Sequence, residues 1–237
     1  MCGRFSLALP AQTIAEFFKT LVLQAVPPRY NIAPTQDVLA IRARAEENGR
    51  YAQPLRWGLV PSWSKDIKIG AKLTNARSET LGQKPSFRNA YKYRRCLIPT
   101  DGFYEWKRDG AGKQPYFFHA ADKSPLGFAG LWEHWSGPSG EELETCTIIT
   151  TDANRLMAPV HHRMPVILKP EDYDRWLDPG QRDRAKLESL LVPCPDGLLA
   201  AYPVGTHVNR AGNEGPKCIE PMPTDPPSRP PLQGSLF

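Results

Sequence analysis

Short strand-like segments recur along this sequence, and they limit its fold more than any other feature. Each is rich in β-branched and aromatic residues and ends at turn residues. Residues 107–113 contain two glycines between two such segments and predict a β-hairpin. Many strands with few helices favour an α+β fold around a largely antiparallel, barrel-like β-sheet. The predicted strands are residues 38–42, 55–60, 95–98, 103–107, 116–119, 127–135, 146–150 and 165–168.

A few short helices are expected to flank this sheet. The first begins near Thr13, which forms a capping-box pattern with Glu16 and is followed by apolar residues at helical spacing as far as Leu21. Two further helices are predicted over residues 171–177 and 182–192.

Composition divides the chain into one domain and a tail. Residues 214–237 contain closely spaced prolines and few apolar residues, which predicts a disordered, polyproline-like tail. The remaining residues, 1–213, are enough for a single domain with a sizeable core. An apolar fraction of 41% and a charged fraction of 23% are those of an ordinary globular protein.

Several classes of protein are disfavoured by what the sequence lacks. It has neither a long apolar stretch nor a secretory signal, so we expect a cytoplasmic protein without a membrane partner. Its five cysteines form no Cys-x-x-Cys pair, so neither a disulfide framework nor a zinc ribbon is indicated. The net charge of +5 is too mild to indicate nucleic-acid binding by itself. We expect a monomer that needs no cofactor.

Cys2 offers unusual chemistry if Met1 is removed. Its free amine and thiol would then form a 1,2-aminothiol, in which the amine converts an aldehyde to an imine and the thiol closes a thiazolidine ring. Because such an amine titrates at about 7.7 to 8.0 and a thiol near about 8.5, we expect both to be partly deprotonated at neutral pH. The alternative is that Cys2 is a small buried residue of an N-terminal strand.

Two further polar positions stand out from their surroundings. Glu105 lies between the aromatic residues Tyr104 and Trp106, and burial there would raise its pKa and suit it to proton transfer near neutral pH. The alternative for Glu105 is an outward-facing strand residue. His161 and His162 would point to opposite faces of a strand, so they are expected to be a poor zinc site, and no metal site is predicted.

A series of motifs occurs in order between Cys2 and about Asn213. They are Met1-Cys-Gly-Arg-Phe5, Arg29-Tyr-Asn-Ile-Ala-Pro34, Arg56-Trp-Gly-Leu-Val-Pro61, Asn75-Ala-Arg-Ser-Glu-Thr80, Arg95-Cys-Leu-Ile-Pro99 with Asp101-Gly-Phe-Tyr-Glu-Trp106, and His161-His-Arg-Met-Pro165. This set closely resembles the SRAP family, the SOS-response-associated peptidases that process abasic sites. Several motifs in a fixed order are far more specific than one short signature.

The resemblance implies a covalent reaction with damaged DNA. The N-terminal cysteine would form a thiazolidine with the ring-opened aldehyde of an abasic site in single-stranded DNA. Cys2 corresponds to the nucleophile, Asn75 to the residue that holds the sugar-phosphate, Glu105 to the carboxylate and His161 to the imidazole. By residue type, His161 can protonate the sugar oxygen, and Glu105 can carry protons to and from the amine, also during reversal.

Basic and aromatic residues near these motifs predict contacts with single-stranded DNA, and with them association with the nucleoid. Trp63, in an expected loop, can stack on a base, whereas Trp57 is expected in the core. Arg88 opens a basic, aromatic stretch that ends at Arg95 and could equally be a solvated surface. Three arginines lie within two residues of a proposed reactive group, as phosphate contacts would: Arg4, Arg77 and Arg163.

The C-terminal residues predict a second interaction. Gln233-Gly-Ser-Leu-Phe237 resembles the short peptides with which bacterial proteins dock on the replication sliding clamp, through Gln233, Leu236 and Phe237. Two other functions remain open for the chain as a whole. One is an N-terminal-nucleophile hydrolase in which Cys2 attacks an amide, and the other is a non-covalent binder of single-stranded DNA. Lyase activity through the imine would accompany the covalent reaction.

Overall fold

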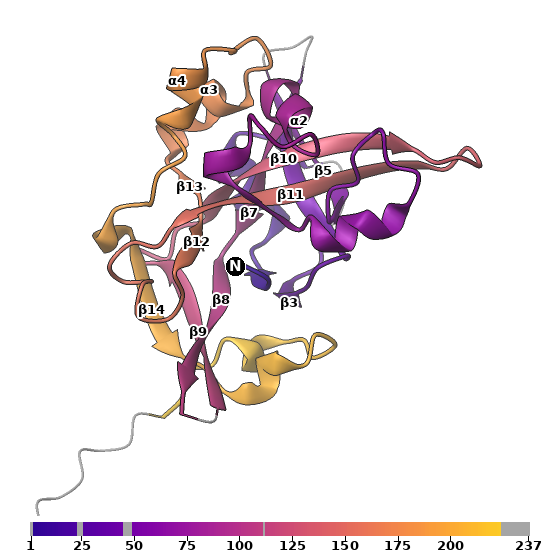
Figure 1. Cartoon of the computed structure of the whole chain (residues 1–237). Coiled ribbons are helices and arrows are strands. Elements are labelled where there is room, and N and C mark those ends of the chain that lie inside the picture. The colour runs from indigo at the N-terminus through magenta and orange to yellow at the C-terminus, as the bar shows by residue number, and fades with distance from the viewer. Residues whose placement is uncertain (1, 23–25, 45–48, 111, 224–237) are drawn as a thin grey trace, which may run out of the picture.

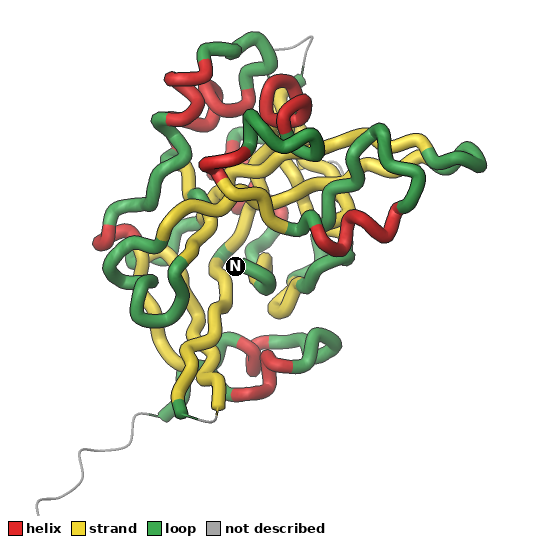
Figure 2. Tube along the Cα trace, in the orientation of Figure 1, coloured by secondary structure: helices red, strands yellow, loops and turns green. Residues whose placement is uncertain are grey.

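The computed structural model describes residues 2–22, 26–44, 49–110 and 112–223. Its architecture is α+β, with most of the chain in two largely antiparallel sheets and short helices at the periphery (Figures 1 and 2). The helices α2, α3 and α4 gather at one end of the molecule, and the segment after β14 packs at the opposite end (Figure 1). The predicted fold class is confirmed.

Five strands close into a barrel. Going round it, β11 pairs with β10, β10 with β7, β7 with β4, β4 with β5, and β5 returns to β11. Because strand directions cannot alternate around an odd-numbered ring, one pair must be parallel, and that pair is β5–β11. The strands are β4 (Asp37–Ala43), β5 (Arg50–Trp57), β7 (Arg95–Thr100), β10 (Leu126–Ser136) and β11 (Glu142–Asp152).

A second sheet packs beside the barrel in the order β14-β9-β8-β1-β3. Its β8–β9 hairpin turns after the Asp109↔Gly112 pair, which confirms the hairpin predicted over residues 107–113. The strands are β1 (Phe5–Leu7), β3 (Arg29–Ile32), β8 (Gly102–Asp109), β9 (Gly112–Ala120) and β14 (Leu199–Pro203).

Four short strands extend the barrel sheet, and two of them flank the same end of β11. They are β2 (Leu21–Val22), β6 (Asn75–Arg77), β12 (Arg163–Pro165) and β13 (Ile167–Leu168). The strand β6 runs parallel to β11, with Thr150 opposite Arg77, and β12 runs antiparallel to it, with Asp152 opposite Arg163. This arrangement brings the motif that starts at Asn75 close to the motif that starts at His161. The single strand predicted over residues 165–168 is therefore two strands, β12 and β13.

Aromatic rings join the N-terminal strand to the barrel. The ring centroid of Phe5 lies 5.2 Å from that of Trp57 and 6.2 Å from that of Phe128, both in edge-to-face geometry. All three side chains are fully buried, and burial of one such side chain contributes roughly 1.5 to 3 kcal/mol. The prediction that Trp57 lies in the core is confirmed. These contacts fix the chain just after Cys2 against the barrel.

The helices differ in part from the predicted ones. The helix α1 begins at Ala11 after Pro10, with no side-chain cap, so the capping box at Thr13 is wrong. It ends at Phe18, where Lys19 adopts a left-handed conformation with φ of 49°. The helices are α1 (Ala11–Phe18), α2 (Arg88–Tyr93), α3 (Tyr173–Leu177) and α4 (Arg184–Glu188), with 3-10 turns η1 (Ile67–Lys72), η2 (Ser78–Thr80), η3 (Pro170–Asp172), η4 (Asp196–Leu198), η5 (Thr206–Asn209) and η6 (Pro216–Cys218).

Arg95 is a core residue, although the basic stretch that contains it was a candidate DNA-binding surface. Its side chain is 3% exposed, and its guanidinium holds α2 and the segment after α3 against β7. The guanidinium donates hydrogen bonds to the backbone carbonyls of Tyr91, Lys92, Trp176, Asp178 and Gln181.

We expect Arg95→Met to lower the free energy of unfolding by about 3 kcal/mol or more, because five carbonyls lose a buried charged donor. Urea unfolding followed by circular dichroism measures the change. The matched control is Arg88→Met, which removes an exposed arginine of the same stretch and should change stability by less than about 0.5 kcal/mol. Equal stability of the two variants would contradict this assignment.

The folded part extends beyond the predicted boundary at residue 213. Glu214 accepts a hydrogen bond from the backbone N–H of Tyr30, at 2.7 Å, and Val204 forms a β-bridge with Pro221. Cys218 is fully buried between these contacts. The packed chain thus continues into the region expected to be tail, and the boundary is corrected accordingly.

The clamp-docking residues Gln233, Leu236 and Phe237 lie outside the described residues, so that interaction stays a prediction. Within the described part of the chain, no helix is long and apolar enough to cross a membrane.

Candidate active site around Cys2

Cys2 lies three residues before β1, the strand that pairs with β8. The two strands are antiparallel, with Phe5 opposite Phe103, and the backbone N–H of Tyr104 donates to the carbonyl of Arg4 at 2.9 Å. With this register, the residues from Arg4 back to Cys2 follow the part of β8 that contains Glu105. Cys2 is 0% exposed and belongs to the main core cluster. Cys2 is therefore buried, as the alternative interpretation expected, although it lies outside the strand, and its role as a nucleophile stays a prediction.

Asn75 contacts Cys2 directly. Its side-chain Nδ2 donates a hydrogen bond to the Cys2 carbonyl at 2.9 Å. The pairing of β6 with β11, with Ile148 opposite Asn75, holds this amide in place. Its Oδ1 atom is buried and has no hydrogen-bond partner among the described residues. A buried, unpaired acceptor of this kind calls for an explanation, and a donor on a bound ligand is one.

The environment of Cys2 suppresses ionisation of its thiol. Burial first, and the negative charge of Glu105 second, raise the pKa of the Cys2 thiol well above its usual value, and a hydrogen bond to the Arg4 backbone offsets this only in part. The raised pKa favours the protonated thiol in the chain that still carries Met1. Partial deprotonation was expected for the chain that begins at Cys2, and it stays a prediction. Glu105 is itself 5% exposed, which excludes an outward-facing strand position.

Glu105→Gln should make the Cys2 thiol ionise at lower pH, because the substitution removes the negative charge that raises its pKa. The rate of iodoacetamide labelling against pH, read from the N-terminal peptide by mass spectrometry, measures this shift. Cys96 is an internal control, since burial, without Glu105, raises its pKa to about 12. A Cys2 profile identical in the variant and the parent protein would contradict the coupling.

His161 lies in the turn just before β12. The backbone N–H of Arg163 donates to its Nδ1 at 2.9 Å, and its ring stacks on that of His162 with a centroid distance of 4.5 Å. The two histidines therefore do not point to opposite faces of a strand, because both precede β12. Among the residues that the structure describes, no group of three or more His, Cys, Asp or Glu side chains is arranged to hold a metal ion.

Two of the three predicted phosphate contacts have partners within the protein. Arg4 donates to Asn31 Oδ1 at 2.7 Å and to the carbonyl of Val208 at 2.9 Å, so it ties β1 to the C-terminal segment. Arg163 is 6% exposed, and both of its Nη atoms bind acceptors of the protein. The structure thus gives Arg4 and Arg163 structural positions that the sequence did not indicate.

The other predicted DNA-binding residues are on the surface. Arg77 and Arg88 are exposed, and Trp63 has 58% of its surface exposed. The loop that carries Trp63 is braced by Trp135, whose Nε1 donates to the carbonyl of Ser64 at 2.7 Å. A large aromatic side chain held open on a fixed loop is suited to stacking on a base.

Glu79 is a residue of the site region that the sequence did not single out. Its carboxylate binds both Nη atoms of Arg163, at 2.6 and 3.0 Å. In the sequence, only its place inside the motif that begins at Asn75 pointed to Glu79. Its partner Arg163 is 84 residues away, so the pairing could not be inferred from the local sequence.

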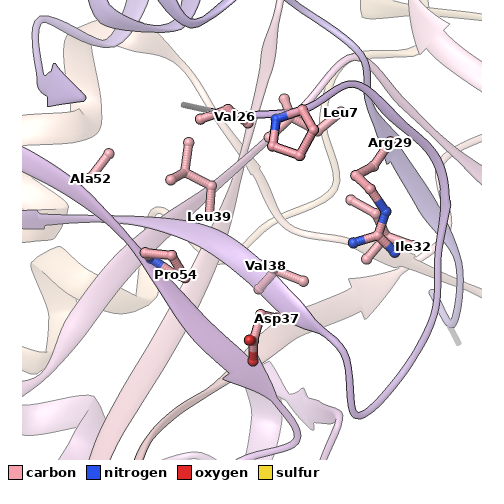
Figure 3. A pocket seen from close by; sticks show the side chains of 10 residues that line it. Leu7, Val26, Arg29, Ile32, Asp37, Val38, Leu39, Ala52 and Pro54 are labelled. Atoms are coloured by element: carbon pink, nitrogen blue, oxygen red, sulfur yellow. The ribbon is translucent and has the colours of Figure 1, made fainter. Parts of the chain in front are cut away.

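A separate apolar cavity of about 210 Å³ lies among β1, β3, β4 and β5 (Figure 3). Apolar side chains such as Leu7, Val38 and Leu39 line most of it, with the polar groups of Arg29 and Asp37 beside them. None of the four predicted catalytic residues lines this cavity, so it is distinct from the site around Cys2.

Comparisons with known proteins identify the same family as the sequence motifs between Cys2 and Asn213. Residues 1–211 match the family model described as SOS response associated peptidase (SRAP). The chain is 46% identical over 226 residues to abasic site processing protein YoqW of Bacillus subtilis (strain 168). The aligned region covers 93% of this chain and 99% of YoqW. It is also 35% identical over 225 residues to abasic site processing protein HMCES of Gallus gallus. Here the aligned region covers 82% of this chain and 66% of HMCES.

A crystal structure of a protein from Bacteroides thetaiotaomicron has the same fold. It superposes with a TM-score of 0.84 at 29% identity, over 93% of this chain and 100% of that one. With the family model covering nearly the whole folded part, the chain belongs to the SRAP family.

Proposed function

We propose that this chain processes abasic sites in single-stranded DNA by forming a covalent thiazolidine between Cys2, exposed by removal of Met1, and the ring-opened sugar. The observation that carries the proposal is the arrangement at Cys2, whose carbonyl is held by Asn75 and whose thiol is coupled to Glu105. The names of the relatives, as abasic site processing proteins, support the same substrate.

The raised pKa of the thiol sets the order of the steps. The α-amine, which titrates near about 7.7 to 8.0, attacks the aldehyde first and forms an imine with loss of one water. The thiol then adds to the imine carbon, and its proton passes to the ring nitrogen, so the overall change is one water released. Glu105, close enough to affect the thiol pKa, is placed to carry that proton.

His161 supplies a second proton-transfer group. In its imidazolium form it can protonate the sugar oxygen as the ring opens, or the hydroxyl as water leaves. Asn75 can also hold the sugar, because its buried Oδ1 is available to accept a hydrogen bond from a sugar hydroxyl or from the amine. Holding the aldehyde within about 3.5 Å of the amine supplies most of the remaining rate enhancement.

Three exposed side chains are proposed to contact the DNA. Arg77 and Arg88 can contact phosphates, and Trp63 can stack on a base. These contacts read no base edges, so the proposal includes weak sequence preference and an affinity that falls steeply with salt. Specificity then comes from the aldehyde of the lesion.

A denaturing gel of the mature protein incubated with an abasic oligonucleotide separates the possible functions. A heat-stable adduct supports the covalent proposal, and strand cleavage alongside it supports lyase activity through the imine. A non-covalent binder gives no adduct on such a gel. An N-terminal-nucleophile hydrolase also gives none, and it would instead release product from an amide substrate.

The sliding clamp is proposed as a second partner through Gln233, Leu236 and Phe237. A fluorescent peptide of residues 228–237 tests this, and no binding to the clamp at roughly tens of micromolar would exclude it. The monomeric state and association with the nucleoid stay predictions.

A further inference from the structure

One side chain connects the two halves of the candidate site. Arg163, at the start of β12, binds the carboxylate of Glu79 through both Nη atoms, at 2.6 and 3.0 Å. Glu79 lies in η2, directly after the strand whose Asn75 holds the Cys2 carbonyl. The backbone N–H of the same Arg163 donates to Nδ1 of His161. Hydrogen bonds and the short stretch of backbone from Asn75 to Glu79 therefore connect Cys2 to His161.

We propose that Glu79 is a positioning residue, which fixes the turn of His161 against the segment that holds Cys2 by clamping Arg163. The inference rests on the proposed function, because it assigns a role within that reaction. It also gives Arg163 a role other than direct phosphate contact.

The charges make this clamp strong. Arg163 is buried, while the Glu79 side chain is 48% exposed, and bidentate pairs of this kind are stronger and more directional than single ion pairs. Burial is the largest single influence and raises the pKa of Glu79, but the hydrogen bond and positive charge of Arg163, together with hydrogen bonds from the Glu79 backbone and Ser78, hold that pKa below its usual value. Since a lowered carboxyl pKa keeps the group ionised down to lower pH, the clamp is intact at neutral pH.

The backbone of Arg163 gives His161 a partner in either protonation state. Nδ1 lies 2.9 Å from the Arg163 nitrogen and 3.0 Å from the Arg163 carbonyl oxygen. Unprotonated Nδ1 accepts from the N–H, whereas protonated Nδ1 donates to the carbonyl. The imidazole can thus gain and lose a proton without turning, provided that Arg163 itself does not move.

Asp152 offers a matched control for Glu79. It also binds Nη1 of Arg163, at 2.7 Å, but it lies on β11 directly opposite Arg163 in a register that the sheet already fixes. Its side chain is 80% exposed. Asp152→Asn and Glu79→Gln therefore remove the same charge from the same guanidinium, and only the second releases η2 from the His161 turn.

The test compares full-length Glu79→Gln, Asp152→Asn and the parent protein in single-turnover adduct formation across pH. We expect Glu79→Gln to be slower by about ten-fold with an altered pH profile, and Asp152→Asn to stay within about two-fold. Long-range ¹H–¹⁵N NMR of the free proteins should show neutral His161 with the proton on Nε2 in the parent and in Asp152→Asn, and a mixture of tautomers in Glu79→Gln.

Equal rates and equal His161 spectra in all three proteins would overturn the inference. Failure of the parent protein to form an adduct would instead refute the proposed function, while the NMR comparison still decides the role of Glu79. If Glu79→Gln does not fold, Glu79→Asp replaces it. The shorter carboxylate should keep the charge but lose one of the two bonds, and a parent-like rate and spectrum there would overturn the inference.

Discussion

Cys2→Ala loses the heat-stable adduct with an abasic oligonucleotide, by at least about 100-fold on a denaturing gel, yet still gives an imine that borohydride traps. The amine of the variant can attack the aldehyde, but no sulfur is present to close the ring. Since an imine hydrolyses far more readily than a thiazolidine, it does not survive heating. The same oligonucleotide, with and without borohydride, gives both measurements.

The control for this substitution is Cys194→Ala, which removes another buried thiol that does not contact the site. It should keep the adduct at the parent level, with a loss of stability of about 1 kcal/mol. An unchanged heat-stable adduct in Cys2→Ala would refute the assignment of the thiol.

Blocking the amine should have an even broader effect. A protein that keeps Met1, or carries an uncleaved N-terminal tag, is expected to form neither the adduct nor the imine that borohydride traps. The nitrogen of Cys2 is then an amide and is not nucleophilic, and the new terminal amine lies at least one residue away from the position of the reacting nitrogen. Loss of both products distinguishes this block from Cys2→Ala, which loses only the adduct. Intact mass spectrometry establishes the N-terminus of each preparation.

The control is the same tagged protein after proteolytic removal of the tag, so that the chain begins at Cys2. It should regain both products in proportion to the fraction processed. A blocked protein that reacts as fast as the processed one would show that another nucleophile, such as a lysine, forms the linkage.

Local sequence pattern predicted the two sheets well where strands are long and bounded by turns. The strands β10 and β11 and the β8–β9 hairpin follow the predicted segments, because alternation and turn residues decide them within one stretch of sequence. The helix α2 was not predicted, since its residues read as a charged, aromatic surface. Arg95 holds that stretch in place, and the carbonyls that accept its hydrogen bonds include those of residues about 80 positions further along the chain.

At the candidate site, the motifs indicated which residues lie near Cys2 better than they indicated the environment of these residues. Asn75 donates a hydrogen bond to the Cys2 carbonyl, and Glu105 is close enough for its charge to raise the pKa of the thiol. The sequence could not indicate that the pKa of the thiol is raised, because this pKa depends on burial by distant strands. Nor does an isolated arginine show whether its charge is paired, and the partner Glu79 of Arg163 became visible only in three dimensions.

Mass spectrometry of the isolated adduct tests the central claim most directly. We predict an intact mass equal to that of the protein without Met1 plus the oligonucleotide, less one water. After digestion, the DNA should remain on the N-terminal peptide, and its Cys2 should resist iodoacetamide under denaturing conditions because the sulfur is bonded. DNA attached elsewhere, or an N-terminal peptide whose thiol is still alkylated, would contradict the account.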